Sequence, residues 1–597
     1  MAAIITSKFR FHNAEQFKES FSEAVATNYY LFIGRPSEFA TGTTGGTDSA
    51  PPTPVDNRRS EAYDWDDMLA AKKIDSTGVT HAIPRRDLDV SGATTYDMYR
   101  PNYSSSNTAT STATNLFDST FYFMTSAYRV YKVLDNGGVA WDAAAPTSVS
   151  KNPFTVAVTG GSYTLKYMLT LSTTNVQNFL TPDFIPVSIT PESNNALADG
   201  SLWNIKVTTA GVAENNGGAW GIGTARAIYN VPIRGDGTGG LCTITIGSGG
   251  ATNGTITSVV VGANGIGYTH ANIIAADIKE QHDIQNSGSV LTFDSDPVLE
   301  VIIGPDGGHG SNPAKELGGH FCLMDVKLQQ TEGFDFSVVN DFRQLGIVRN
   351  PYSYATTSNF TGSTARQTYA IKLASNSGTF AVDEKISQTI AAVGITSIAS
   401  SANGQVMTVV TNDVHKLKTG QMVKIVGGAF PGTSPTGTPP VPTTNGHQGT
   451  HHITVTNTTT FTYTIASTRQ VDASTTATNS PTHTYTTFAP QAVVVEYDAT
   501  NNILFYVQNS YDNQGTDSSY KQNIPFSGNS TVTGATSSAT GVPDTSNSST
   551  YNNTVFVSGY TNPELQPDSG DVIYVENRKP ISRASDQTED VKLVVEF

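Results

Sequence analysis

Short runs of β-branched and aromatic residues recur along almost the whole chain, with clusters of Gly, Asn, Ser and Thr between them. Side chains of the first kind suit the pleated, half-buried surface of a sheet, and the small polar residues favour turns. The runs that predict strands are 121–134, 162–171, 242–246, 255–261, 406–411, 453–465, 492–497 and 591–597. The 53 Gly and 28 Pro among 597 residues agree with frequent turns. The sequence therefore predicts a mainly β fold.

A helical pattern is confined to a few short places, of which residues 13–25 are the clearest. Asn13 and Gln16 have the spacing of a capping box, and three apolar residues follow at intervals of four. The pattern predicts a helix over 13–25 that buries an aromatic stripe.

A second helix is predicted over 60–73. Acidic residues, among them Asp64, Asp66 and Asp67, stand near its predicted start, and lysines stand at its end, which complements the helix dipole. The same carboxylates could serve acid/base catalysis or a metal, but paired carboxylates do such chemistry only when their environment separates their pKa values. We favour the helix start as the explanation.

The charge of the chain limits its partners. It carries 35 Lys and Arg against 51 Asp and Glu, a formal net charge of −16. Binding to nucleic-acid phosphates needs clustered cations, so we expect no nucleic-acid partner. No apolar run approaches the roughly 18 residues of a membrane span, and the N-terminus lacks the apolar core of a signal peptide. We therefore expect no membrane span and synthesis in the cytoplasm.

The two cysteines, Cys242 and Cys322, lie far apart, with no Cys-x-x-Cys and no paired His at ligand spacing. This pattern indicates neither a disulfide scaffold nor a zinc finger. We expect both residues to be buried and to pack as small apolar side chains.

Residues 240–274 look like an inserted β module. They run strand, turn, strand and close on a glycine-rich segment that ends at Tyr268, whose ring can cover the end of a small sheet. The module resembles a β-repeat of phage structural proteins.

Residues 393–486 form a second compact β module, with one long Pro/Thr/Gly loop over 431–449. The flanking runs 380–388 and 491–497 look like two halves of one sheet. We therefore expect this module to be nested inside another domain, because insertions are well tolerated where the chain leaves and re-enters at nearby points.

The second module carries His447, His451 and His452, with His415 upstream. No carboxylate or cysteine accompanies them at ligand spacing, so a solvated loop is favoured over a metal site, which stays open. Residues 304–310 are rich in glycine but lack the Lys-Ser/Thr pair and the helix start of a phosphate-binding loop, and they predict a tight turn.

The familiar catalytic motifs are missing from the sequence. It contains no Gly-x-x-x-x-Gly-Lys, no His-Glu-x-x-His and no coherent Ser/His/Asp arrangement. We therefore predict no catalytic, cofactor-binding or metal-binding residues, no cofactor, and no enzymatic activity.

Three stretches are charged and polar where the neighbouring sequence is Thr, Ser and Gly. They are residues 83–87, 340–351 and 571–597. In the first, Arg85 and Arg86 present planar guanidinium groups that suit carboxylates or backbone carbonyls. Ordinary strands with surface charges would explain the same patterns.

Taken together, these stretches resemble the gene product eight family of baseplate wedge proteins from T-even-like contractile-tail bacteriophages. The motifs are IITSKFR (4–10), IPRRD (83–87), FRQLGIVRNP (342–351), IYVENRKP (573–580) and DQTE (586–589). Looser matches are 32–35, 128–132, 163–167 and 184–187. The resemblance covers 1–190, 311–352 and 560–597.

The resemblance implies a structural subunit with a β-sandwich core, a few short peripheral helices and, in this chain, inserted small β modules. Such subunits enter each of six wedges around a central hub as a homodimer, and their partners are other baseplate wedge proteins. The implied role is baseplate assembly and its rearrangement on host attachment before sheath contraction. The implied location is the virion tail baseplate, after synthesis in the host cytoplasm.

Contacts in such an assembly must be specific and switchable, which polar edges with Arg–carboxylate pairs provide better than one large apolar patch. The interface candidates are Arg85, Arg86, Arg343, Arg349, Asn577, Arg578, Asp586 and Glu589. Pairing within the chain is an equal alternative for each of them.

The predicted organisation is a family core enlarged by insertions. The core comprises 1–204, 311–369 and 551–597, and a β-rich insertion covers 205–310. An inserted β domain of 370–392 and 487–550 holds the small module 393–486.

The alternative function is a tail-fibre-like receptor or glycan-binding protein, which the Thr/Asn/Gly-rich modules would support. A receptor fibre should show trimeric repeats and a distal tip, whereas the recognisable motifs here stand at both chain ends. A mixed role, in which the family core builds the wedge and the module 393–486 decorates it or clamps a neighbour, is a third hypothesis.

Overall fold

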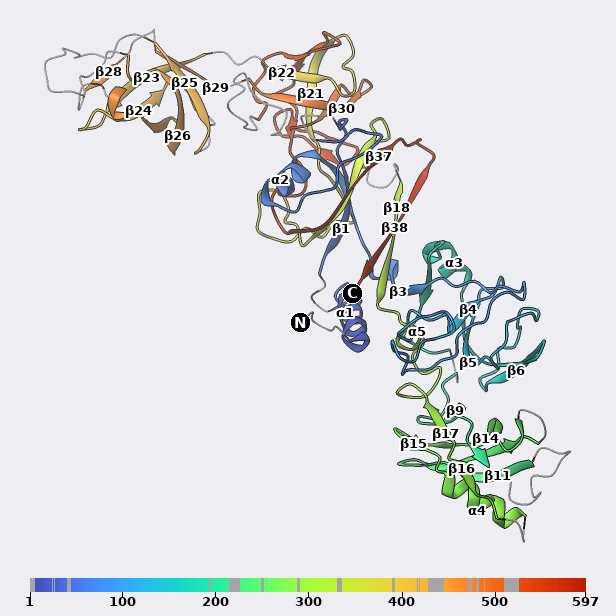
Figure 1. Ribbon diagram of the computed structural model, residues 1–597. Coiled ribbons are helices and arrows are strands. Elements are labelled where there is room, and N and C mark those ends of the chain that lie inside the picture. Colours follow the sequence, from blue (N-terminus) through green and yellow to red (C-terminus); the bar gives the residue numbers. More distant parts are fainter. Residues whose placement is uncertain are drawn as a thin grey trace. The chain divides into compact units, whose positions relative to one another are not determined.

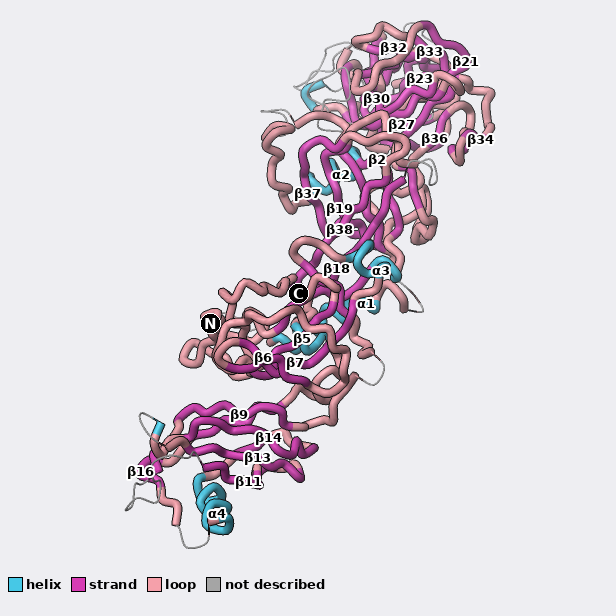
Figure 2. Tube along the Cα trace, turned by 90° about the vertical axis from the view of Figure 1, so that its right-hand side faces the viewer, coloured by secondary structure: helices cyan, strands magenta, loops and turns pink. Residues whose placement is uncertain are grey.

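The protein is mainly β with a few short helices, as predicted (Figures 1 and 2). The computed structural model describes residues 6–597 except 24, 26, 40–44, 193–194, 214–225, 249–251, 287–289, 330–334, 389–391, 416, 418, 428–444, 470, 472–474, 479–482, 488 and 509–524. The chain forms two compact units. One comprises Met1–Ala26, Asp75–Asp325 and Val591–Phe597, and the other comprises Thr27–Ile74 and Val326–Asp590.

The first unit is built on two four-stranded antiparallel sheets. One has the order β38 (Thr588–Glu596), β18 (Phe321–Gln329), β3 (Val79–Pro84) and β8 (Phe184–Val187), with one end of β38 and of β18 assigned to the second unit. The other has the order β4 (Tyr122–Met124), β5 (Arg129–Asp135), β7 (Gly161–Thr170) and β6 (Phe154–Val158).

The two sheets share one apolar core, which makes this part of the unit a β-sandwich. Ile83 of β3 and Ile185 of β8 belong to the same buried cluster as Val130 of β5 and Met168 of β7. A second cluster, with Tyr131 of β5, covers the other face of the β4–β7 sheet. Burial on both faces explains why β5 is an almost continuous apolar run instead of an alternating one.

The first helix differs in position from the prediction. Helix α1 spans Ser7–Glu19, and the Thr6 side chain caps it by accepting a hydrogen bond from the amide of Phe9. The predicted cap at Asn13 therefore lies inside the helix, and the predicted end at Val25 lies beyond it, with Val25 89% exposed. Thr6 caps the helix in place of Asn13, because its side chain stands in extended backbone directly before Ser7. Residues 4 and 5 of the first motif lie outside the described residues.

The second predicted helix is wrong beyond Asp67. Helix α2 spans Arg58–Asp67 and is capped by Asn57, and Met68–Lys73 is strand β2. Sheet pairing overrode the helical pattern here, because β2 lies between two strands of a five-stranded sheet. The acidic cluster thus stands in the second half of the helix, so the helix-start explanation is wrong for it.

That five-stranded antiparallel sheet organises the second unit. Its order is β20 (Thr364–Arg366), β2, β1 (Tyr29–Gly34), β19 (Phe342–Arg349) and β37 (Asp571–Ile581). Tyr30 and Phe32 of β1 pack with Trp65 of α2 in one buried cluster.

Residues 202–303 of the first unit have their own core. The elements are β9 (Leu202–Thr209), β10 (Val212–Ala213), β11 (Arg226–Pro232), β12 (Arg234–Gly235), β13 (Thr238–Ile246), β14 (Ile256–Ile266), β15 (Ala271–Asn272), α4 (Ala275–Gln285), β16 (Phe293–Ser295) and β17 (Val298–Ile303). Tyr268 covers the end of the β13–β14 hairpin as predicted. It is 3% exposed, and its hydroxyl donates to the carbonyl of Ile233 and accepts from the amide of Gly240.

The second unit also contains two closed six-stranded barrels. The segment that forms the nested barrel is inserted in the sequence of the outer barrel, between β22 and β30. The ring of the outer barrel is β21 (Tyr369–Ser377), β31 (Ile503–Val507), β30 (Gln491–Asp498), β22 (Lys385–Gln388), β32 (Val532–Gly534) and β33 (Thr540–Pro543). The ring of the nested barrel is β23 (Val393–Ser400), β24 (Val406–Thr411), β27 (Thr460–Thr464), β26 (Gly449–Asn457), β25 (Met422–Val426) and β29 (Thr484–Thr487). Closure leaves neither ring with an open sheet edge.

Pairing of β22 with β30 confirms that the runs on either side of the nested module belong to one sheet. Smaller elements complete the chain. They are η1 (Ser76–Gly78), α3 (Thr173–Phe179), α5 (Pro313–Leu317), η3 (Ser467–Arg469), β28 (Thr476–Thr478), β34 (Thr550–Tyr551), β35 (Thr554–Val555) and β36 (Tyr560–Thr561).

The cysteines and the glycine-rich turn agree with the sequence. Cys242 and Cys322 are free and buried, and burial raises the pKa of each thiol to about 12. Residues 304–310 form a tight turn in which the Gly308 amide donates to the carbonyl of Pro305. The expectation that no helix begins nearby was wrong, since α5 follows at Pro313. Among the described helices, none is long and apolar enough to cross a membrane.

Candidate functional site

Arg85 and Arg86, the first two interface candidates, make contacts within the first unit. Arg85 donates to Asp87 (3.0 Å) and to the carbonyl of Thr181 (3.0 Å). The guanidinium of Arg86 lies 4.5 Å from the centre of the Tyr122 ring and donates to the carbonyl of Phe117 (2.8 Å). Arg86 thus helps to cover the sandwich core, whereas the Arg85 side chain is 27% exposed.

Arg343 of β19 is a core residue of the second unit. It is 5% exposed, donates to Asp48 (2.9 Å) and also donates to the carbonyl of Pro36. Arg349 at the other end of the same strand is 46% exposed at its side chain and pairs with Asp571 (2.6 Å). This partner raises the pKa of Arg349.

Asn577 and Arg578 lie on β37, an edge strand of the five-stranded sheet. Asn577 accepts a hydrogen bond from Gln344 (3.1 Å) and donates to the carbonyl of Pro52 (2.9 Å). Arg578 is exposed and pairs with Glu576 of its own strand (3.0 Å). Two irregularities interrupt the pairing of β37 with β19, a feature that hinders edge-to-edge association.

Asp586 and Glu589 differ in exposure. Asp586 is exposed, while the Glu589 side chain is 10% exposed and lies 3.5 Å from the guanidinium of Arg583. Burial raises the pKa of Glu589 and lowers that of Arg583. Seven of the eight candidates therefore have a partner inside the chain, and those with substantially exposed charges are Arg85, Arg349, Arg578 and Asp586.

Asp64 of α2 belongs to a series of hydrogen-bonded side chains that includes the interface candidate Asn577. Gln344 of β19 donates from one amide nitrogen to Asp64 (2.8 Å) and to Asn577 (3.1 Å). Burial, followed by the neighbouring Asp67, raises the pKa of Asp64 to about 7 against the hydrogen bond from Gln344. Asp67 itself is 2% exposed and pairs with Arg35 (3.3 Å).

Two buried lysines were not identified from the sequence, although both stand in looser matches of the family resemblance. Lys132 of β5 and Lys166 of β7 are 0% exposed and face each other across the sheet. Lys132 pairs with Glu316 of α5, and Lys166 donates to Asn195 (2.6 Å). The apolar residues on both sides of each lysine were the one sequence signal for burial. A lysine on a strand, however, ordinarily indicates an exposed position.

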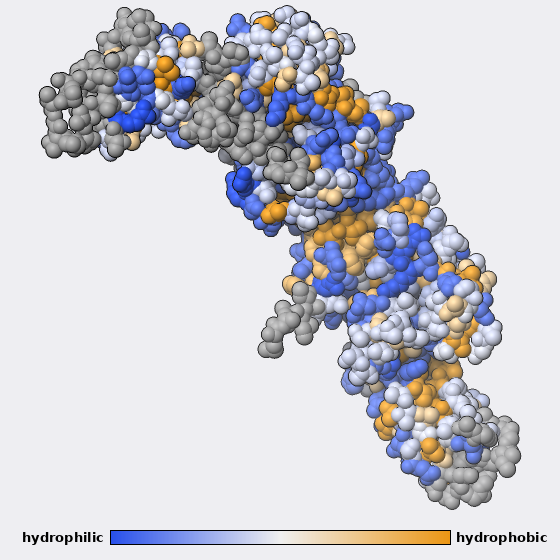
Figure 3. All heavy atoms as spheres, turned by 45° about the horizontal axis from the view of Figure 1, so that its top comes forward, coloured by the Kyte–Doolittle hydropathy of each residue, from blue (hydrophilic) through white to orange (hydrophobic). Residues whose placement is uncertain are grey.

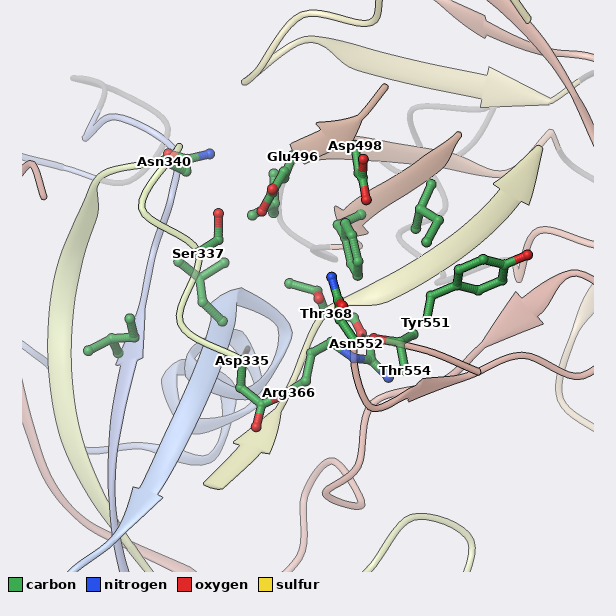
Figure 4. Close-up of a pocket in the computed structure, with 15 residues that line it drawn as sticks. Asp335, Ser337, Asn340, Arg366, Thr368, Glu496, Asp498, Tyr551, Asn552 and Thr554 are labelled. Carbon is green, nitrogen blue, oxygen red and sulfur yellow. Dashed lines mark hydrogen bonds between the residues drawn. The ribbon is translucent and has the colours of Figure 1, made fainter. Parts of the chain in front are cut away.

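A cavity of about 120 Å³ lies in the second unit (Figure 4). Its lining comes from separate segments and comprises Ile33, Leu69, Asp335, Ser337, Asn340, Arg366, Thr368, Val495, Glu496, Asp498, Ile503, Phe505, Tyr551, Asn552 and Thr554. In the view of Figure 4, Glu496 and Asp498 project from β30 on one side, and Asp335 and Arg366 lie together on the other.

Three carboxylates and one guanidinium lie among the apolar and polar residues that line the cavity. Burial raises the pKa of Asp335 to about 6 and raises that of Glu496. Arg366 is buried, and its guanidinium donates to the carbonyls of Thr368 and Asn562. No sequence motif marked this cavity, because the chain brings its residues together only through the outer barrel and the neighbouring sheet.

The histidines of the nested barrel are mostly buried, which corrects the expectation of a solvated loop. His447 is 0% exposed and His451 is 8% exposed, while His452 is exposed on β26. Most of the predicted loop 431–449 lies outside the described residues. Within the described part, no group of three or more His, Cys, Asp or Glu side chains could hold a metal ion.

The surface gives no single extended apolar site over the face drawn in Figure 3, where hydrophilic and hydrophobic areas alternate. Exposed large hydrophobic residues are scattered, and those of the 202–303 module are Val212, Tyr229, Val260, Ile266, Ile284, Val290 and Val298. Single apolar side chains of this kind are common on protein surfaces.

No protein-family model matches this chain, and no curated protein matches it.

Proposed function

We propose that this protein is a structural, non-enzymatic subunit of a phage tail baseplate wedge. It would contribute to baseplate assembly and to the rearrangement that follows host attachment and precedes sheath contraction. Its partners would be a second copy of the chain and other wedge proteins.

The observation that carries the proposal is the pairing of three distant motifs in one sheet. Strand β1, from the N-terminal match, pairs with β19, from the middle match, and β19 pairs with β37, from the C-terminal match. In register, Gly346 lies opposite both Phe32 and Val575. Motifs that are separated by hundreds of residues thus form adjacent strands, which is what a single inherited core interrupted by insertions would give.

The chain ends support the same view. Arg10 of α1 donates to Glu596 and to the carbonyl of Phe597, so the first motif contacts the end of the C-terminal match in the first unit. The last strand, β38, continues into the sheet of β18 and β3. The insertions leave these core pairings intact.

Exposed charges on the core provide surfaces for wedge contacts. Arg578 lies on the edge strand β37, Arg349 lies on the neighbouring strand β19, and Arg85 directly follows β3. Rim charges of this kind set the specificity and the rate of association more than the affinity.

A double variant tests the proposed interface. Arg85→Ala with Arg86→Ala should remain folded but lose dimerisation or wedge incorporation, measured by light scattering and by assembly with the other tail proteins of the same phage. Arg129→Ala, a half-buried arginine at the start of β5 in the first unit, is the matched control. Normal assembly of the double variant would exclude these two residues from the interface.

Co-expression tests the function itself. The tagged chain, produced together with the other tail proteins of its phage, should be recovered in a defined subcomplex with wedge proteins. Recovery only as a free trimer would contradict the proposal and favour a receptor fibre.

A further inference from the structure

The nested barrel contains a cluster of buried histidines. His447, which lies just before β26, is 0% exposed, and His483, which lies just before β29, is 4% exposed. Both strands pair with β25. The two histidines therefore lie at the ends of strands that close the ring.

The two rings face each other through the same type of atom. Nε2 of His447 and Nε2 of His483 are 3.2 Å apart, which is a hydrogen-bonding distance. One Nε2 must donate its proton and the other must be unprotonated to accept it. If both rings were charged, two N–H groups would point at each other.

The charges that act on His447 oppose its protonation. The charges that bear on His447 are those of His483, of His451 on β26 and of Arg469 in η3, and all of them are positive when protonated. Tyr463 of β27 donates its hydroxyl proton to the carbonyl of His447 (2.8 Å) and stacks on His451 (ring centres 4.3 Å apart). The carboxylate of Asp413, which follows β24, acts on Tyr485 of β29.

We propose that the His447–His483 pair is an acid-sensitive latch of the nested barrel. Opening lets both rings take up protons, whereas in the closed pair a second proton would replace the hydrogen bond between the rings by repulsion in a buried site. Acid therefore favours separation of the ends of β26 and β29 from β25. The inference does not depend on the proposed role in the baseplate.

The pH window follows from the direction of the pKa change. Burial, followed by the neighbouring positive groups, lowers the pKa of His447 to about 4, below its usual 6.5. The folded barrel therefore binds fewer protons than the opened one between these values, so its stability is complete above about pH 6.5 and falls as the pH drops towards 4.

Hydrogen exchange of the full chain at pH 7 and pH 4.5, corrected for intrinsic rates, tests the latch. Peptides from β26 and β29 should lose protection by about 50-fold for one titrating histidine with these pKa values. Peptides from β31 and β33 of the outer barrel, in the same sample, should lose less than about threefold. Equal losses in both barrels, or no loss in either, would overturn the proposal.

Variants identify the residues responsible. His447→Gln with His483→Gln keeps an amide pair that can hydrogen-bond but cannot titrate in this range, so the nested barrel should keep its protection at pH 4.5. His452→Gln, on the exposed side of β26, is the control and should behave as the wild type. If the double variant is already unprotected at pH 7, the single variant His483→Gln replaces it, and an unchanged acid loss in that variant overturns the proposal.

Zinc distinguishes a latch from a metal site. Zn²⁺ added at micromolar concentration at pH 7 should leave the exchange of β26 and β29 unchanged. An increase in protection that both glutamines abolish would overturn the latch and make the pair metal ligands.

Discussion

Lys132 and Lys166 lie directly opposite each other on β5 and β7, and both side chains are completely buried. A single carboxylate, that of Glu316, pairs with Lys132, while Lys166 donates to the side chain of Asn195 and to the carbonyl of Tyr167. Burial and the charge of Lys132 lower the pKa of Lys166 to about 8. The core of the first unit thus depends on a polar network that must be complete.

Glu316→Gln should destabilise the first unit by about 3–5 kcal/mol, because it leaves buried lysines without their carboxylate. Hydrogen exchange of peptides from β5 and β7 would measure the change. The control is Lys132→Met with Glu316→Gln, which removes the lysine charge while the side-chain oxygen of the new glutamine can still accept from the amide of Gly310, and it should cost less than the single variant. A loss below 1 kcal/mol in Glu316→Gln would contradict the account of this network.

Asp64→Asn should stabilise the second unit at pH 8 by about 4 kcal/mol. The folded-state pKa of Asp64 is raised to about 7, so the wild type incurs the cost of charging this carboxyl as the pH rises from about 4 to 7. The two proteins should converge towards pH 4. Calorimetry over this pH range measures the difference, and Asp56→Asn, at an exposed position before α2, is the control. A constant difference from pH 4 to 8 would show that titration of Asp64 is not its cause.

Gly346→Ala should destabilise the second unit by about 2 kcal/mol or more. A Cβ at this position would lie 2.2 Å from the Phe32 ring and 2.6 Å from the carbonyl oxygen of Tyr574, so the strands β1, β19 and β37 could not keep their spacing. Gly262→Ala on β14 is the matched control, since its Cβ would meet its nearest atom at 3.7 Å. Thermal unfolding compares the two, and equal effects would count against the close packing of the three strands.

Arg343→Ala and Arg349→Ala should separate a core residue from a surface residue of the same strand. The first removes a buried guanidinium and its bonds to Asp48 and Pro36, and should cost about 2–4 kcal/mol. The second removes an exposed pair with Asp571 and should cost about 1 kcal/mol or less. Urea unfolding measures both. The reverse order would contradict the burial described for β19.

Local pattern predicted most strands but not their partners. The run 406–411 coincides with β24, and 162–171 differs from β7 by one residue at each end. The runs 121–134 and 453–465 each divide into two strands joined by a turn. Closure of β21 on β31 and of β23 on β24 could not be predicted, because it depends on contacts between residues far apart in sequence.

The sequence did not predict which charged residues are buried. Charged side chains are ordinarily exposed, but Lys132, Arg343 and Arg366 are buried, because other segments supply their partners. For the same reason His447, which was expected in a solvated loop, is buried beside His483. Tyr268, in contrast, was predicted as the cover of a small sheet because it closes a glycine-rich segment. The structure adds that a Cβ at Gly237 or Gly265 would meet its ring.

A cryo-electron microscopy map of the assembled virion tail, with this chain located and its copies counted, tests the central claim most directly. Six or twelve copies at wedge positions around the baseplate are the predicted result. Copies found only at the tips of fibres would contradict it.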